Sequence, residues 1–247
     1  MTRRFIVLLM MFVASNLASA QSLKTYSGPY DGGQATYTYI EQEDGSRLYQ
    51  GKFSWVKTIR ERVLTAEGEF LNGKRNGTWT FTSKNTNRSF PANEKLVCQY
   101  SNGIHEGEYS YQASANYDGK GSGSYIKTDY TKAPPQMALK ANCKSNSFDG
   151  HVIMTSADKD KWDALFETSA NNIKSAVLKY SSQAGSFTYD TETGTEYFLD
   201  SETGEKSVVN TGLWSRFKYS IRARCIDFEG LCEPYPNSSD RYIPLDF

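Results

Sequence analysis

The feature that most constrains the fold of this chain is a glycine-and-aromatic motif that recurs along it. One copy reads GEFLNGKRNGTWTF and a later copy reads CQYSNGIHEGEYSYQ. Both contain Asn-Gly, three further residues, and then Gly-x-aromatic-x-aromatic, so Gly73 matches Gly103 and Gly77 matches Gly107. Such self-similarity indicates an architecture in which each copy is one structural unit and neighbouring copies bury a shared core.

A third copy of the motif is weaker. In CKSNSFDGHVIM, Gly150 takes the place of Gly77, and Cys143 falls where Phe70 and Tyr100 stand in the other copies. The aromatic positions after the glycine are aliphatic here. The repeat therefore extends past the two clear copies, with a looser pattern.

Each copy predicts a β-hairpin. Trp79 and Phe81 alternate with threonines, which is the period of a strand with one buried face. Asn-Gly at the end of such a strand favours a tight turn, because both residues tolerate positive φ. A glycine loop that holds a phosphate would be followed by a helix, whereas Gly77 is followed by the β-prone TWTFT. Lys74 and Arg75 are therefore expected to be solvated turn residues.

The motif resembles the MORN repeat, in the variant form found in exported bacterial proteins. The resemblance is carried by GEFLNGKRNGTWTF and YSNGIHEGEYSY, covers residues 49–111 well, and extends loosely over residues 26–154. It implies a mainly β fold, an antiparallel MORN-like β-meander of hairpins. It also implies a scaffold or contact surface for proteins, and occasionally for membrane lipids, with no single defined chemistry.

The sequence on either side of the clear copies extends the meander. ATYTYIEQEDGSRLYQGKFSWV predicts another hairpin, with its turn at Asp44 and Gly45. Residues 137–143 predict a further strand after the helix-breaking KAPPQ.

Residues 156–182 predict one long amphipathic helix. Ser156 can cap its first turn, and Lys179 lies near its end, where the helix dipole favours a cation. A lone amphipathic helix must bury its apolar stripe, most simply on the sheet. The residues with helical spacing are Trp162, Leu165, Phe166, Ile173, Val177 and Tyr180.

The segment GLWSRFKYSIRARCIDF predicts a last long strand, in a C-terminal β-hairpin region. Its apolar face would carry Leu213, Phe217, Tyr219, Ile221 and Cys225, and its other face Trp214, Arg216, Lys218, Arg222 and Arg224. The basic face can attract an acidic partner, an acidic glycan or lipid headgroups. More often such a face is solvated, and its charges discourage association between sheet edges.

Two acidic turns, DTETG and DSETG, flank a predicted short strand at residues 196–199. Carboxylate-rich turns can bind calcium, but neither turn has the dense alternating oxygen ligands of an EF-hand loop. We interpret both as ordinary turns.

The first residues predict a secretory signal peptide. Arg3 and Arg4 precede an apolar run and Ala-Ser-Ala, and the run is shorter than the ~20 residues that cross a bilayer. We expect cleavage after Ala20 and export to the periplasm or beyond. The remaining chain divides into the meander at residues 21–155 and the helix with the C-terminal strands at residues 156–247, packed on the same sheet.

The four cysteines predict two disulfides, because an even count in an exported chain favours disulfides over metal ligands. Four cysteines allow three pairings. The repeat alignment places Cys98 and Cys143 on the aromatic face, and a short glycine-containing loop separates Cys225 from Cys232. We therefore predict the pairs Cys98–Cys143 and Cys225–Cys232, and no metal or cofactor.

No recognisable catalytic constellation is present in the sequence. It contains no HExxH, GxSxG or Cys-x-x-Cys, and His105 and His151 each lie beside a predicted turn. An enzyme is therefore less favoured than a binding protein. A cell-envelope carbohydrate-active enzyme with an unrecognised carboxylate pair stays an alternative, because acidic residues are plentiful.

The favoured function is a non-catalytic exported binding or scaffold module whose β-sheet surface contacts a protein or a glycan. Trp55, Trp79 and Tyr109 could stack on sugar rings, although a place in the core beneath the helix is the more favoured role. The chain has 28 basic and 28 acidic residues, which argues against nucleic-acid binding driven by net charge. Peripheral membrane attachment through the basic strand is the other alternative.

Overall fold

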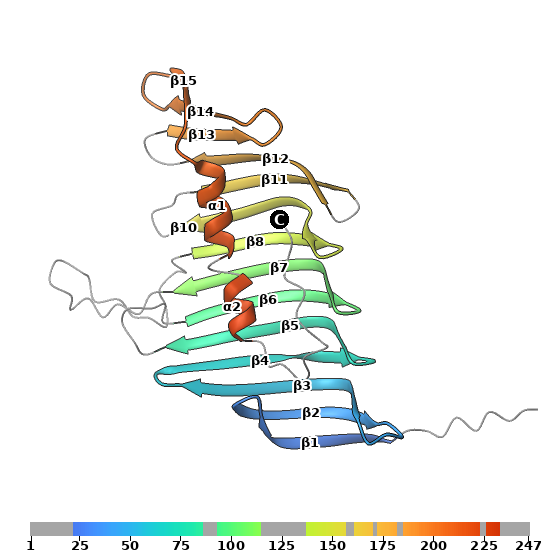
Figure 1. The fold of residues 1–247 in the computed structure, drawn as a ribbon. Helices are drawn as coiled ribbons and strands as arrows, with labels where there is room; N and C mark the ends of the chain where they lie inside the picture. Colours follow the sequence, from blue (N-terminus) through green and yellow to red (C-terminus); the bar gives the residue numbers. More distant parts are fainter. Residues whose placement is uncertain are drawn as a thin grey trace, which may run out of the picture.

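The computed structural model describes residues 22–85, 93–114, 137–156, 161–169, 172–181, 185–222 and 226–232. These residues form one antiparallel sheet of 15 strands that follow one another in chain order, with the short β9 paired to β8 beside the main path (Figure 1). The predicted mainly β meander is therefore confirmed. The signal peptide predicted at residues 1–20 lies outside the described residues.

The strands have the following bounds: β1 Leu23–Tyr30, β2 Gly33–Glu41, β3 Arg47–Ile59, β4 Arg62–Leu71, β5 Lys74–Asn85, β6 Asn93–Ser101, β7 Ile104–Ser114, β8 Met137–Lys144, β9 Ser147–Phe148, β10 Gly150–Ser156, β11 Lys161–Ser169, β12 Asn172–Ser181, β13 Gly185–Asp190, β14 Thr195–Asp200 and β15 Lys206–Val209. Two helices follow, α1 Leu213–Ile221 and α2 Asp227–Leu231. Among the described residues, no helix has the length and apolar character that a membrane span requires.

The Asn-Gly pairs form the tight turns that the sequence predicts. Asn72 and Gly73 join β4 to β5 with φ of 51° and 76°, and Asn102 and Gly103 join β6 to β7 with φ of 53° and 87°. Two consecutive positive φ angles define the hairpin turn whose twist matches that of the flanking strands. Each clear copy of the motif is thus a strand, a two-residue turn and a return strand.

The second glycine of each copy lies where the strand register shifts. Gly77 has φ 68° opposite the shift between Glu67 and Glu69, and Gly107 has φ 105° opposite the shift between Cys98 and Tyr100. A glycine with positive φ at such an irregularity is typical of a β-bulge, which bends the strand and increases its twist. The corners that β5 and β7 turn beside their hairpin loops follow from these bulges (Figure 1).

The third copy of the motif occupies the predicted place in the repeat. Tyr100 lies opposite Gly77 in the β5–β6 ladder, and Cys143 lies opposite Gly107 in the β7–β8 ladder. Gly150 also has positive φ, at 75°. The alignment of Cys143 with Tyr100 is therefore correct.

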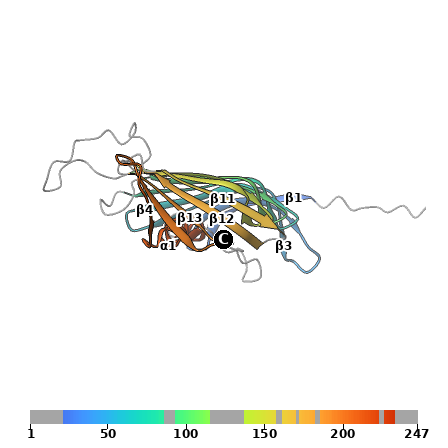
Figure 2. The ribbon, with the colours of Figure 1, turned by 90° about the horizontal axis from the view of Figure 1, so that it is seen from above.

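One face of the sheet carries the aromatic core, and both helices pack on this face (Figures 1 and 2). The rings of Trp162 and Phe217 of α1 are 6.0 Å apart, and those of Tyr111 and Phe228 of α2 are 5.8 Å apart. The largest fully buried side chains are Trp79, Tyr109, Tyr111, Phe81, Phe148 and Phe217. Because successive side chains of a strand point to opposite faces of the sheet, the threonine, serine and charged residues between these aromatics lie on the other face.

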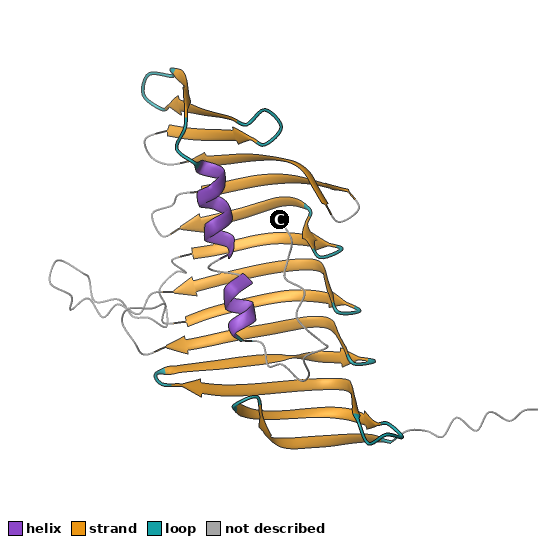
Figure 3. Ribbon diagram, viewed as in Figure 1, coloured by secondary structure: helices purple, strands orange, loops and turns teal. Residues whose placement is uncertain are grey.

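The prediction of one long helix at residues 156–182 is wrong. Residues 161–169 and 172–181 form β11 and β12, paired antiparallel over their lengths (Figure 3). Trp162 and Ala164 are buried, whereas Leu165 is 41% exposed, which is strand alternation. Helix propensity is a weak preference, and each new strand of a meander gains a full ladder of hydrogen bonds from the preceding strand.

The predicted last strand is wrong as well, because its first part is the helix α1. Leu213, Phe217 and Ile221 are buried, and a spacing of four residues places side chains on one face of a strand and also on one face of a helix. Tyr219 distinguishes the two structures. It would be buried in the strand, but it is 74% exposed.

The predicted disulfides are absent from the described residues. Cys98 and Cys143 are buried free thiols on the aromatic face, as the repeat alignment placed them, but β7 lies between their strands. Strands two places apart in a sheet are about 9.6 Å apart, beyond the ~7 Å that a disulfide bridges. Cys232 is also a free thiol, and Cys225 lies outside the described residues.

Both acidic turns are ordinary turns. Asp190 Oδ1 accepts a hydrogen bond from the Glu192 amide at 2.8 Å, and Asp200 Oδ1 accepts bonds from the Glu202 and Thr203 amides at 2.8 Å each. The carboxylates thus cap their own turns, and the short predicted strand between them is β14.

Candidate functional site

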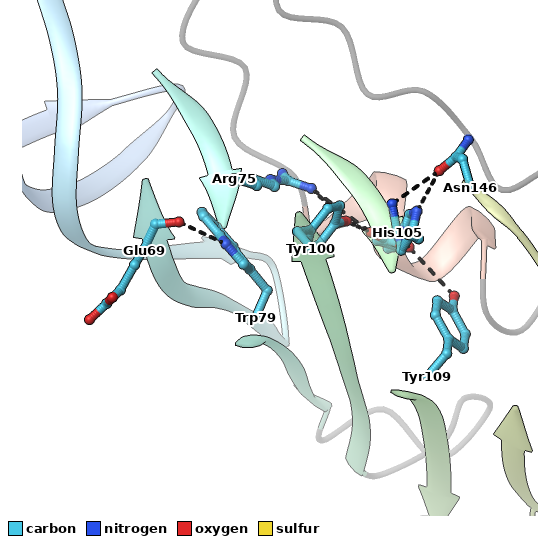
Figure 4. Close-up of polar contacts among 8 residues, drawn as sticks. Glu69, Arg75, Trp79, Tyr100, His105, Tyr109 and Asn146 are labelled. Carbon is cyan, nitrogen blue, oxygen red and sulfur yellow. Dashed lines mark hydrogen bonds and ion pairs between the residues drawn. The ribbon is translucent and has the colours of Figure 1, made fainter. Parts of the chain in front are cut away.

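The three aromatic residues considered as sugar platforms lie in the core. Trp55 is 3% exposed, Trp79 is 0% and Tyr109 is 1%. The indole N–H of Trp55 donates to the Tyr30 carbonyl at 3.0 Å, and that of Trp79 donates to the Glu69 carbonyl at 3.1 Å (Figure 4). Their ring faces pack on protein, in the role that the sequence favoured.

The basic residues predicted to line one strand face do not form such a face. Lys218 and Arg222 lie one helical turn apart at the end of α1, whereas Arg216 lies on another side, with its guanidinium 5.8 Å from the Trp162 ring. Arg224 lies outside the described residues. The described basic residues therefore do not form one continuous patch.

A polar cluster is buried on the aromatic face beneath α2. Its centre is Glu229, which is 0% exposed. The Glu229 carboxylate accepts hydrogen bonds from the hydroxyls of Tyr100 and Tyr109 and lies 3.0 Å from His105 Nε2 (Figure 4 shows the surrounding side chains). The cluster joins the last described helix, α2, to the two strands β6 and β7 of the second clear repeat.

Arg75 completes the charge balance of this cluster. Its guanidinium donates to the Tyr100 hydroxyl at 3.0 Å and lies 3.8 Å from Glu229 Oε1. It also lies 4.6 Å from the centre of the Trp79 ring, within the range of a cation–π contact. Burial by itself would raise the pKa of Glu229, but His105, Arg75 and Tyr100 outweigh burial and lower it. Arg75 is therefore a buried residue, and its prediction as a solvated turn residue is wrong.

The repeat itself explains why Arg75 and His105 point inward. Each lies two residues before the bulge glycine of its copy, Gly77 and Gly107 respectively, and each is the second residue after its hairpin turn. Phe148 holds the same position before Gly150 and is fully buried. The sequence alignment therefore contained the signal that these three residues share one face. It gave no indication of Glu229, which belongs to helix α2, where the sequence predicted a short glycine-containing loop between Cys225 and Cys232.

His105 is held at both ring nitrogens. Nε2 faces Glu229, and Nδ1 lies 2.8 Å from Asn146 Oδ1, in the turn between β8 and β9. The backbone N–H of His105 also donates to Asn146 Oδ1 at 3.4 Å, and the Asn146 amide donates to the His105 carbonyl at 3.0 Å. Asn146 therefore fixes the orientation of the imidazole.

Three side chains of this region could hold a metal ion. The ligand atoms of Cys98, His105 and Glu229 all lie within 4.8 Å of one another, and all three residues are buried. Burial raises the pKa of the Cys98 thiol well above its usual range, and the charge of Glu229 raises it further. Because these groups are sealed in the core, they are poorly placed to meet a large substrate.

A shallow groove of about 750 Å³ lies on the opposite, polar face, across β2–β5. Its outward residues are hydroxyl-bearing or charged, and all are exposed or half-buried: Thr36, Thr38, Lys52, Ser54, Glu67, Glu69, Thr78 and Thr80. Neither helix packs on this face, because both belong to the aromatic core. Within the described ranges, no helix or further strand packs over the groove, which extends across four adjacent strands.

Comparison of the chain with models of known protein families and with curated proteins finds no match. The resemblance to MORN repeats therefore rests on the repeated residues alone.

Proposed function

We propose that this protein is a non-catalytic binding module that holds a glycan chain in the polar groove of β2–β5. The single observation that carries the proposal is the groove, a hydroxyl-rich hollow of about 750 Å³ on the face without helices. Threonine and serine hydroxyls donate and accept hydrogen bonds, and carboxylates accept them, so together they suit a ligand rich in hydroxyl groups.

A glycan suits this surface better than a protein does. The buried centres of protein–protein interfaces are depleted in charge and enriched in aromatic residues, methionine and arginine. The outward residues of the groove are instead threonine, serine, lysine and glutamate. Its floor rests on the aromatic core, in which the Phe53 and Trp79 rings lie 5.7 Å apart. We expect this packing to hold the groove in shape before a ligand binds.

The absence of catalysis is part of the same proposal. Three clustered titratable residues, Cys98, His105 and Glu229, are at most 1% exposed. A general acid or base must come within hydrogen-bond distance of the proton that it transfers. Their burial therefore supports binding rather than turnover.

The test is glycan binding by a groove variant and a matched control. Glu67→Gln/Glu69→Gln removes two carboxylates from the groove, and Glu108→Gln removes one exposed carboxylate from the same face on β7, outside it. On a glycan array, we expect the groove variant to lose binding at least tenfold and the control to bind like the wild type. Equal binding by all three proteins would place the ligand elsewhere, and capture of a protein with no glycan bound would contradict the glycan assignment.

We also propose that the protein is exported, with the signal peptide removed after Ala20. The basic residues, apolar run and Ala-Ser-Ala of the first segment support this proposal. N-terminal sequencing of the mature protein should begin at Gln21, and an intact Met1 on the protein isolated from its native compartment would contradict it.

A further inference from the structure

We propose that Cys98, His105 and Glu229 form a buried zinc site that ties helix α2 to the repeat strands. The residues come from three elements, β6, β7 and α2, which only the folded chain brings together. This site lies on the aromatic face, away from the polar groove, and the proposal does not depend on the glycan-binding function.

The donor set suits zinc. A thiolate, an imidazole and a carboxylate are the three ligand types that proteins use for zinc, whereas calcium and magnesium prefer sets of oxygen ligands. With Zn–S near 2.3 Å and Zn–N near 2.0–2.1 Å, tetrahedral ligand atoms lie about 3.3–3.6 Å apart. The three ligand atoms lie within 4.8 Å of one another, and His105 Nε2 lies 3.0 Å from Glu229 Oε1. Small side-chain movements are enough to bring the three ligand atoms to the separations of a tetrahedral zinc site.

The groups around the site hold its ligands in place. A histidine that binds a metal usually directs its other ring nitrogen at a hydrogen-bond acceptor, which sets both its tautomer and its orientation. His105 Nδ1 lies 2.8 Å from Asn146 Oδ1, so Nε2 is directed at Glu229 and the site. Glu229 is held in turn by Tyr100 and Tyr109. Asn146 is therefore a positioning residue for the zinc ligand.

The charges of the ligands suit a divalent cation. Cys98 would bind zinc as a thiolate, with its proton released to solvent, and Glu229 as a carboxylate, so the two ligands together balance the charge of Zn²⁺. Arg75 lies 3.8 Å from Glu229 Oε1, at the edge of this balanced site. The desolvation cost of a net buried charge at the metal is thus avoided.

The first test uses the untagged full-length chain with cobalt as the probe. After zinc is removed with a chelator under mild denaturant and the protein is refolded with Co²⁺, we expect one cobalt per chain and a thiolate-to-cobalt charge-transfer band in the near ultraviolet. Metal analysis of the purified protein should likewise find about one zinc per chain. A folded wild type that takes up no cobalt, or that binds it without the thiolate band, overturns the proposal without recourse to any variant.

The second test identifies the ligands. Cys98→Ser should lose the band, whereas Cys232→Ser, a change at another buried free thiol on the same face, should retain it. Asn146→Gly suits the positive φ of 65° at this turn and removes only the side-chain acceptor, so it should weaken zinc binding about 10–100-fold. A Cys98→Ser protein that keeps the band, or an Asn146→Gly protein that binds zinc like the wild type, would contradict this assignment of ligands.

Discussion

At the scale of single residues, the glycines of the repeat have two different physical roles. Gly77 has φ 68°, and a Cβ there would meet no atom within 4 Å. Gly68 has no positive φ, but a Cβ there would lie 2.3 Å from the Trp79 ring. The first glycine is therefore needed for its backbone conformation and the second for the space that it leaves.

This difference predicts that alanine at these two positions lowers the free energy of unfolding by different amounts. Gly77→Ala should lower the free energy of unfolding by about 1–2 kcal/mol, the cost of a left-handed backbone for alanine. Gly68→Ala should lower it by about 3 kcal/mol or more, because Trp79 is fully buried and overpacking strains the core. Urea denaturation measures both values. Equal costs would mean that the Trp79 ring can move aside.

The buried thiol of Cys232 predicts a dependence of stability on alkaline pH. Burial raises the pKa of the Cys232 thiol to about 12, well above its ordinary value. A group whose pKa is raised on folding contributes its stability below the unfolded pKa and loses it as the pH rises through the folded pKa. Between pH 9 and about 12, the wild type should therefore lose stability relative to Cys232→Ala, by at most about 1.4 kcal/mol per pH unit.

The Cys232→Ala variant serves as the reference, because tyrosine and lysine residues titrate over the same pH range in both proteins. Urea denaturation at several pH values measures the difference between the two proteins. A difference that stays constant with pH would show that the folded state accommodates the thiolate.

At the scale of secondary-structure elements, α1 packs through a stripe of residues four apart. Phe217 is 0% exposed and Tyr219 is 74% exposed, although the two residues would share one face of a strand. Phe217→Ala should therefore cost about 3–5 kcal/mol, the range for removing a buried aromatic side chain. Tyr219→Ala should change the free energy of unfolding by less than about 0.5 kcal/mol.

Thermal or urea unfolding of the two variants decides between helix and strand at this segment. Similar large losses in both would favour a strand with alternating burial and would contradict the helix.

The α2 element has an electrostatic reason for its place on the sheet. The repeat directs Arg75 and His105 inward, and a buried cation without a partner is costly. Glu229 supplies the carboxylate that both of them face. The inward Arg75 and His105 thus favour a docking segment that carries a carboxylate.

At the scale of the whole molecule, one sheet continues from β1 to β15, and its main path pairs each strand with its neighbours in chain order, apart from the short β9, which pairs with β8. This arrangement predicts the state of the thiols. When the unreduced protein is unfolded and treated with a thiol reagent, Cys98, Cys143 and Cys232 should all be labelled, as mapped by mass spectrometry of peptides. A Cys98–Cys143 crosslink would mean that β7 does not lie between β6 and β8.

The sequence by itself determined the local features of this protein. Asn-Gly turns, bulge glycines and alternating aromatics are short-range signals, because each depends on the φ angles or on the side-chain period of a few adjacent residues. They were sufficient for a meander over the repeats, for their hairpin turns and for the face of the repeated aromatic positions, including that of Cys143.

Only the tertiary structure decided which elements form where local signals are ambiguous. Residues 161–181 have helical spacing of their apolar residues and yet pair as strands, because an existing sheet edge offers hydrogen bonds that outweigh a weak propensity. Residues four apart, such as Leu213 and Phe217, satisfy a helix and a strand equally. Contact between Glu229 and His105 joins residues far apart in the chain, so no local pattern could reveal the buried cluster.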